Sequence, residues 1–190
     1  AGAFLSLAFG GTGVAAYMRG RGVHVAGDVA GAAVFAFSDY VLSKIGSGGV
    51  NQLWAFAWAP WVLRAIDRAA RGRPGATAAL GLWSGLALLA GHVQIWFYVG
   101  PALVLAGLSA ADEVGPGALG RILRGAALGL LVAAVQWLPS AELVRAAGAR
   151  PEVDPELLRQ WSAPLHVLAA NLLPGIFGSR PAGYWGGESF

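Results

Sequence analysis

Strongly polar side chains interrupt this otherwise apolar sequence at only a few positions, and these residues are the ones whose types could support chemistry. The clearest case is Gly91-His92-Val93-Gln94, inside the run LWSGLALLAGHVQIWFYVGPALVL. Polar groups at membrane depth are costly and usually face a cavity or a partner. The other polar residues that could share such a cavity are Asp39, Lys44, Asn51, Gln52, Gln136, Glu142, Arg145, Arg150, Tyr184 and Glu188.

Several standard chemistries do not fit the sequence. It contains no GxxxxGK[ST] phosphate loop, no HExxH and no GxSxG. It has no cysteine, which excludes disulfides and thiolate metal sites. The three histidines are far apart, and the topology expected below places His24 on the opposite face from His92 and His166, which excludes a three-histidine zinc site.

Apolar helices must position these polar residues. Charged residues make up 12% of the chain, against about 25% in a typical soluble domain. Hydrophobic residues make up 56%, with a mean hydropathy of +0.59. This composition predicts an integral membrane protein. The arginines lie between apolar runs, so we expect membrane lipids as partners and no nucleic acid.

A bilayer core of about 30 Å needs roughly 20 apolar residues in a helix. We therefore expect an all-α, polytopic transmembrane helix bundle with about six spans, near residues 1–18, 26–43, 50–66, 74–91, 94–111 and 122–139. The run 76–111 would be about 54 Å long as one helix, which exceeds the core thickness. GHVQ is its most polar interior point, so we predict a tight turn there between two antiparallel helices.

The arginines indicate the orientation of these spans. Clusters follow the first and third spans and precede the sixth, so six alternating spans place all three on one side, which the positive-inside rule makes cytoplasmic. The GHVQ turn and the other candidate residues then lie on the extracytoplasmic face. Residues 1–139 would form the transmembrane region. Residues 140–190 would form an extracytoplasmic loop, in which leucines at helical spacing predict short interfacial helices.

Each polar residue also has a plain structural interpretation. Interfacial polar turns are common, so His92 and Gln94 could cap helix ends and bond lipid headgroups. The remaining interpretations are helix starts for Asn51 and Gln52, and ion pairs for Asp39 with Lys44 and for Glu142 with Arg145. The sequence leaves these alternatives open.

Six stretches follow one another along the chain: AYMRGRGV, AAVFAFSDYVLSKIG, NQLWAFAWAPWVLRAIDRA, LALLAGHVQIWFY, VQWLPSAELVRAAGAR and NLLPGIFG with YWGGESF. In this order they resemble the bacterial YfhO-like membrane proteins. That family is similar in architecture to the multispanning GT-C glycosyltransferases, including the protein O-mannosyltransferase type. The GHVQ turn and the QWLPSAELVRAAGAR stretch are the specific parts of the resemblance.

The resemblance implies a glycosyltransferase of the bacterial plasma membrane that moves a sugar from a polyprenyl-phosphate donor to an extracytoplasmic cell-envelope acceptor. Such enzymes use a carboxylate base, with cationic side chains or a divalent metal supporting the leaving phosphate. The candidates by role are Asp39 and Glu188 for catalysis, Arg145 and Arg150 for phosphate, and His92, Gln94, Gln136, Glu142 and Tyr184 for the rest of the substrate site.

One departure from the GT-C pattern affects the catalytic assignment. In those enzymes the catalytic acid lies in the first extracytoplasmic loop, and we expect this chain to begin downstream of it. The competing functions are an envelope-lipid transporter or flippase and a non-catalytic membrane scaffold.

Overall fold

Helices make up most of the part of the chain that the structure describes. The computed structural model describes residues 2–146, 155–156, 169, 173, 176–179 and 183–184. The chain divides into two compact units, Ala1–Ala141 and Glu142–Phe190. In chain order the helices are α1 (Gly2–Gly20), α2 (Val25–Ala36), α3 (Asp39–Gly46), α4 (Val50–Ala57), α5 (Ala59–Ala70), α6 (Ala76–Leu89), α7 (Val93–Val114), α8 (Ala118–Val132) and α9 (Ala134–Ala146).

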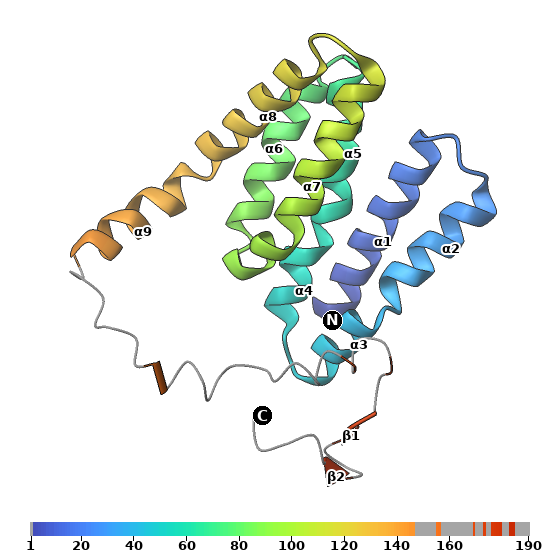
Figure 1. The fold of residues 1–190 in the computed structure, drawn as a ribbon, viewed down its shortest axis with the longest axis vertical. Helices are drawn as coiled ribbons and strands as arrows, with labels where there is room; N and C mark the ends of the chain where they lie inside the picture. The colour runs from blue at the N-terminus through green and yellow to red at the C-terminus, as the bar shows by residue number, and fades with distance from the viewer. Residues whose placement is uncertain are drawn as a thin grey trace. The chain divides into compact units, whose positions relative to one another are not determined.

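Helix α5 is the centre of the first unit, because it packs against α1, α6, α7 and α8 (Figure 1). Its sequence APWVLRAIDRAA is amphipathic, and Val62, Ala65, Ile66 and Ala69 fall at helical spacing and are buried. Pro60 lies in the first turn, where the missing backbone N–H removes no helical hydrogen bond. The arginines on the other face of α5 are thereby left at the surface.

Helices α6 and α8 approach each other closely along two pairs of glycines. Gly81 and Gly85 lie one turn apart on α6, and Gly125 and Gly129 do so on α8. A Cβ added at Gly85 would lie 2.5 Å from the Cβ of Val132 and 3.1 Å from the carbonyl oxygen of Gly129. Both helices thus carry the GxxxG spacing that lets backbones pack tightly in apolar surroundings.

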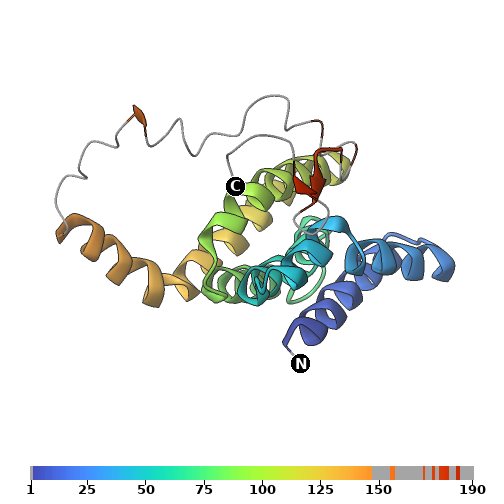
Figure 2. The ribbon, with the colours of Figure 1, turned by 90° about the horizontal axis from the view of Figure 1, so that it is seen from below.

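Helices α1 and α2 form a hairpin at one side of this group (Figure 2, blue). Phe9 of α1 fits among tryptophans of the third predicted span, with ring centroids 4.9 Å from Trp58 and 5.5 Å from Trp61. The Trp61 indole donates a 2.9 Å hydrogen bond to the carbonyl oxygen of Phe9. These aromatic contacts join α1 to α5.

The prediction of six spans exceeds what helix length and composition support. In the described residues, two segments are long and apolar enough to cross a membrane, Val25–Gly46 (α2 with α3) and Val93–Val114 (α7). A third exists if α8 and α9 together form one span. Helix α6 has 14 residues, about 21 Å, which is shorter than a bilayer core. The glycines, Thr12, Tyr17 and Arg19 lower the hydropathy of α1.

Breaks in the helices account for part of the difference. The third predicted span divides at Trp58 into α4 and α5, and α8 and α9 meet at Ala133 with a bend of 66°. In an unbroken helix the carbonyl of Leu130 would accept from the backbone N–H four residues later. Here the Trp137 indole donates to it at 2.9 Å. The bend therefore does not leave the Leu130 carbonyl unpaired, because the Trp137 indole donates to it.

The second unit is described only in part. Pro155 and Glu156 are helical, and the other residues of the expected interfacial helices lie largely outside the described residues. Strands β1 (Gly178–Ser179) and β2 (Gly183–Tyr184) form a short antiparallel ladder. The described chain is therefore helical apart from this ladder, which the sequence prediction did not include.

Candidate functional site

The predicted turn at GHVQ is confirmed. Helix α6 ends at Leu89 and α7 begins at Val93. Gly91 between them has φ +84°, a left-handed conformation that glycine adopts without steric cost. The Trp96 indole donates a 3.1 Å hydrogen bond to the carbonyl of Ala87 and so joins the two helices across the turn.

His92 and Gln94 occupy different environments within this turn. His92 is the residue before the first turn of α7, but its side chain makes no capping hydrogen bond, and its Nδ1 is buried without a partner. Gln94 is exposed, and its Nε2 donates a 2.9 Å hydrogen bond to the Tyr98 hydroxyl one turn later. The capping interpretation of His92 therefore does not hold in this structure.

An apolar pocket of about 230 Å³ lies beside the turn. It runs between α6, the start of α7 and the bent α8–α9 pair, and its lining residues are Leu88, Val93, Leu130, Ala133, Gln136, Trp137 and Ser140. Gln136, which the sequence assigned to the site, lines this pocket together with Val93 of the GHVQ turn. The pocket combines a hydrocarbon lining with one amide and one hydroxyl side chain.

A second polar group lies at the same end of the first unit, around α3 and the start of α4 (Figure 1). The Lys44 ammonium stands 5.8 Å from the centroid of the Tyr40 ring. The Tyr40 hydroxyl and the Gln52 Oε1 are buried and have no hydrogen-bond partner. Asp39 is exposed in the first turn of α3, and the ion pairs of the described residues do not include Asp39 with Lys44.

Unsatisfied polar atoms concentrate at this end. Among the described residues four buried side-chain atoms lack a partner, and three of them belong to Tyr40, Gln52 and His92. A buried polar group without a hydrogen bond costs about 1–3 kcal/mol. Each such group calls for an explanation such as a bound molecule or water. Sequence reasoning missed Tyr40, although its position beside Asp39, just after the apolar run AAVFAF, is visible in the sequence.

The remaining predicted site residues belong to the second unit, which is described only in part. Glu142 and Arg145 are exposed near the end of α9, and the described ion pairs do not join them. Tyr184 belongs to β2, where only its backbone is described. Arg150 and Glu188 lie outside the described residues. Within the described residues, no three His, Asp or Glu side chains are grouped so as to hold a metal ion.

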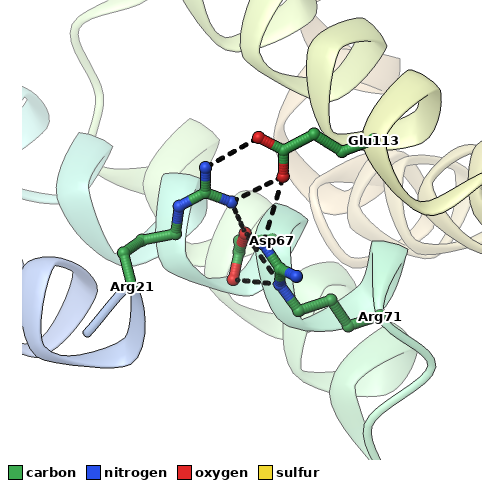
Figure 3. A network of polar contacts seen from close by, with 4 residues as sticks. All are labelled: Arg21, Asp67, Arg71 and Glu113. Atoms are coloured by element: carbon green, nitrogen blue, oxygen red, sulfur yellow. Dashed lines mark hydrogen bonds and ion pairs between the residues drawn. The ribbon is translucent and has the colours of Figure 1, made fainter.

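The opposite end of the first unit carries a network of four charged residues that the sequence analysis did not anticipate (Figure 3). Arg21, in the α1–α2 loop, donates to Asp67 of α5 at 2.9 Å and to both oxygens of Glu113 of α7 at 2.8 and 2.9 Å. Arg71, at the end of α5, contacts the same two carboxylates. The network therefore ties α1, α5 and α7 together at one end.

Burial and charge explain why this network is structural. Asp67 is only 8% exposed, and its carboxylate accepts hydrogen bonds from both arginines. The hydrogen bonds to Glu113, and then to Asp67, raise the pKa of Arg21 above its ordinary value. The bond to Asp67 likewise raises the pKa of Arg71. The i, i+4 spacing of Asp67 and Arg71 could have predicted their ion pair from the sequence. Their contacts with Arg21 and Glu113 form only through the tertiary fold.

Other arginines at this end bind helix termini. Arg121 of α8 donates to the carbonyls of Ala69 and Ala70 at the C-terminal end of α5, where helix carbonyls lack an i+4 amide donor. Arg19 pairs at 3.0 Å with Asp28, whose side chain is 1% exposed. The arginine clusters therefore gather at one end of the first unit, and the GHVQ turn lies at the other.

Comparison with known proteins adds no identification. No known protein family matches the chain, and no curated protein or solved structure matches it either.

Proposed function

We propose that the chain is part of a multispanning membrane glycosyltransferase that uses a polyprenyl-phosphate sugar as donor and acts on an extracytoplasmic cell-envelope acceptor. The observation that carries this proposal is that buried, unpartnered polar atoms and an apolar pocket both lie at the GHVQ end of the first unit. A polyprenyl-phosphate sugar has the same two parts, a polar headgroup and a hydrocarbon chain.

The described residues suggest how such a donor would bind. The hydrocarbon chain would enter the pocket beside Val93, and Gln136 would meet the polar part of the donor at the pocket wall. His92 Nδ1, which is buried without a partner, would hydrogen-bond the headgroup. Gln94 lies one helical position beyond Val93 and is held by Tyr98.

The chemistry itself falls to residues that the sequence resemblance assigns. Arg145 and Arg150 would bind the phosphate, because guanidinium groups match phosphate oxygens in pairs. Asp39 or Glu188 would serve as the base, and a divalent metal could support the leaving phosphate. These roles rest on the sequence resemblance and on residue type.

The surface of the helices supports a membrane location. Large apolar side chains are exposed along both candidate spans, including Val29 and Val34 of α2 and Val104, Leu105 and Leu108 of α7. Apolar surface of this extent is rare on soluble monomers and suits contact with lipid. The concentration of arginines at one end favours a cytoplasmic location for that end and an outer location for GHVQ.

The test is turnover of radiolabelled polyprenyl-phosphate sugar by membranes that contain the native protein. His92→Asn removes the imidazole and keeps a residue type that caps helices well. The matched control is His24→Asn at the other end, where the His24 Nδ1 accepts from the Ala26 N–H in a cap that asparagine can replace. Loss of a hydrogen bond to a charged group predicts about a 10- to 150-fold lower turnover for His92→Asn alone.

The possible outcomes separate the competing functions. Sugar transfer that His92→Asn leaves unchanged would remove His92 from the site. Movement of the labelled lipid across the membrane without consumption would replace the transferase with a flippase. A protein that neither consumes nor moves the lipid would be a scaffold.

A further inference from the structure

We infer that the arginine end of the first unit holds a second lipid site, which binds the phosphate headgroup of an acidic membrane phospholipid. The site is a cavity of about 400 Å³ at the end of α5, within the range of small-molecule sites. Its lining residues are Tyr17, Gly20, Arg64, Asp67, Arg68, Arg71, Arg73 and Pro74. It lies at the other end of the unit from the proposed donor site and does not depend on sugar transfer.

The charge of this cavity favours an anion. Four arginines and one aspartate line it, a formal charge of +3 (four minus one). Asp67 does not repel an anion strongly, because Arg21 and Arg71 already neutralise its carboxylate at 2.9 to 3.3 Å. The negative end of the α5 helix dipole is also covered, since Arg121 donates to its last carbonyls.

Three of the arginines retain donors for a ligand. In the described residues the side chains of Arg68 and Arg73 have no hydrogen-bond or ion-pair partner, and both are exposed. Arg64 uses its Nε for the carbonyl of Ala16 at 3.2 Å, which leaves its two terminal nitrogens for other partners. Guanidinium groups bind phosphate oxygens through charge-assisted hydrogen bonds.

An apolar cavity next to these arginines favours a lipid over free phosphate. This cavity has a volume of about 550 Å³ and lies between α1, α2, α5 and α7, with Val14, Met18, Leu63 and Ala102 in its lining. Tyr17 lines both the apolar cavity and the arginine cavity. Their shared wall would let one ligand place its phosphate among the arginines and an acyl chain against the helices. Basic pockets of this kind recognise acidic lipid headgroups.

The experiment is a lipid titration of the intact, detergent-solubilised protein, read by native mass spectrometry. The probes are phosphatidylglycerol, the neutral lipid phosphatidylcholine, and inorganic phosphate. We expect tighter binding of phosphatidylglycerol than of phosphatidylcholine. Each arginine near an anionic headgroup is worth about 1 kcal/mol, so Arg68→Gln/Arg73→Gln should weaken phosphatidylglycerol binding about 30-fold.

A matched control tests whether the cavity or general surface charge is responsible. Arg124→Gln removes the charge of an exposed arginine of α8 that does not line the cavity. In the described part of the chain the Arg124 side chain hydrogen-bonds only to the carbonyl of Gly120 in its own helix. Arg68→Gln should weaken binding about fivefold, and Arg124→Gln should have little effect. Equal losses would overturn the site. Equal affinity for the two lipids, or displacement of phosphatidylglycerol by inorganic phosphate at the same affinity, would overturn the lipid assignment.

Discussion

The close approach of α6 and α8 makes a quantitative prediction about Gly85. A methyl group placed there would lie 2.5 Å from the Val132 Cβ, and carbon atoms pack favourably only at about 3.5–4.0 Å. Rotation about the side-chain bonds cannot relieve the 2.5 Å contact, because both atoms are Cβ atoms. The added methyl group would also lie 2.6 Å from the Val132 Cγ1 and 3.1 Å from the Gly129 carbonyl oxygen, which is backbone. The two helices must therefore separate by about 1 Å.

Overpacking of this kind typically costs about 1–3 kcal/mol. Alanine is also a better helix former than glycine, by about 0.8–1 kcal/mol, and this gain must be subtracted. Gly120→Ala measures this gain in helix propensity without overpacking, because a methyl group at Gly120 of α8 would have only a 3.9 Å contact to the Arg124 side chain. We expect Gly85→Ala to lower the free energy of unfolding by about 1–3 kcal/mol relative to Gly120→Ala.

The assay is equilibrium unfolding in mixed micelles with increasing dodecyl sulfate, followed by circular dichroism. Gly120→Ala should be as stable as the wild type or slightly more stable. If Gly85→Ala matches Gly120→Ala, the helices are not in backbone contact at this position, and the glycine packing described for α6 and α8 is incorrect.

Three further predictions concern polar contacts of the first unit. Asp28 is 1% exposed, so Arg19→Met alone would leave its buried charge unpaired. The single variant should therefore be less stable in denaturant unfolding than Arg19→Met combined with Asp28→Asn, which removes that charge. Equal stabilities would contradict this. Arg21 and Glu113 are partly exposed, so their ion pair should be weak. A double-mutant cycle with Arg21→Met and Glu113→Gln should give a coupling free energy below about 1 kcal/mol that falls further in high salt. A coupling free energy that does not depend on salt would exclude a solvent-screened pair. Trp137→Phe removes the indole N–H that donates to the Leu130 carbonyl in the last turn of α8. The free energy of unfolding should fall by about 0.5–1.5 kcal/mol, and amide hydrogen exchange at the α8–α9 junction should become faster. Unchanged exchange there would show that the bend does not need this hydrogen bond.

The sequence predicts helices well where length and turn chemistry agree. The GHVQ turn follows from the length of the apolar run, and Gly91 supplies the left-handed residue at that point. The breaks at Trp58 and Ala133 could not be predicted in this way, because spans are assigned from hydropathy averaged over about 19 residues, and such a window does not resolve a break inside it. As a result, predicted spans that were continuous in hydropathy are bent or divided in the structure.

The candidate site was predictable only in its parts. Residue type and position made His92 and Gln136 candidates, and the structure adds the apolar pocket that Gln136 and Val93 line. The charge network could not be read from the chain, because Arg21 and Glu113 are 92 positions apart and meet only through packing on α5. The GxxxG spacing of α6 and α8 was present in the sequence and is the signal that could have paired these two helices.

Hydrogen-bonding demand distinguishes the Arg21–Asp67–Arg71–Glu113 network from the candidate functional residues better than residue type does. Asp28 at the arginine end also has a buried oxygen without a partner, but its other oxygen is paired with Arg19. Asp67 is a buried carboxylate in a cluster of arginines, which by type alone would suggest catalysis, but each of its oxygens accepts from an arginine. His92, Gln52 and Tyr40 are less conspicuous, but each has a buried polar atom without a partner. A folded chain loses stability by leaving such atoms unsatisfied, and a bound polar group recovers it. This difference is why we place the donor at the GHVQ end and assign the Arg21–Asp67–Arg71–Glu113 network to stability.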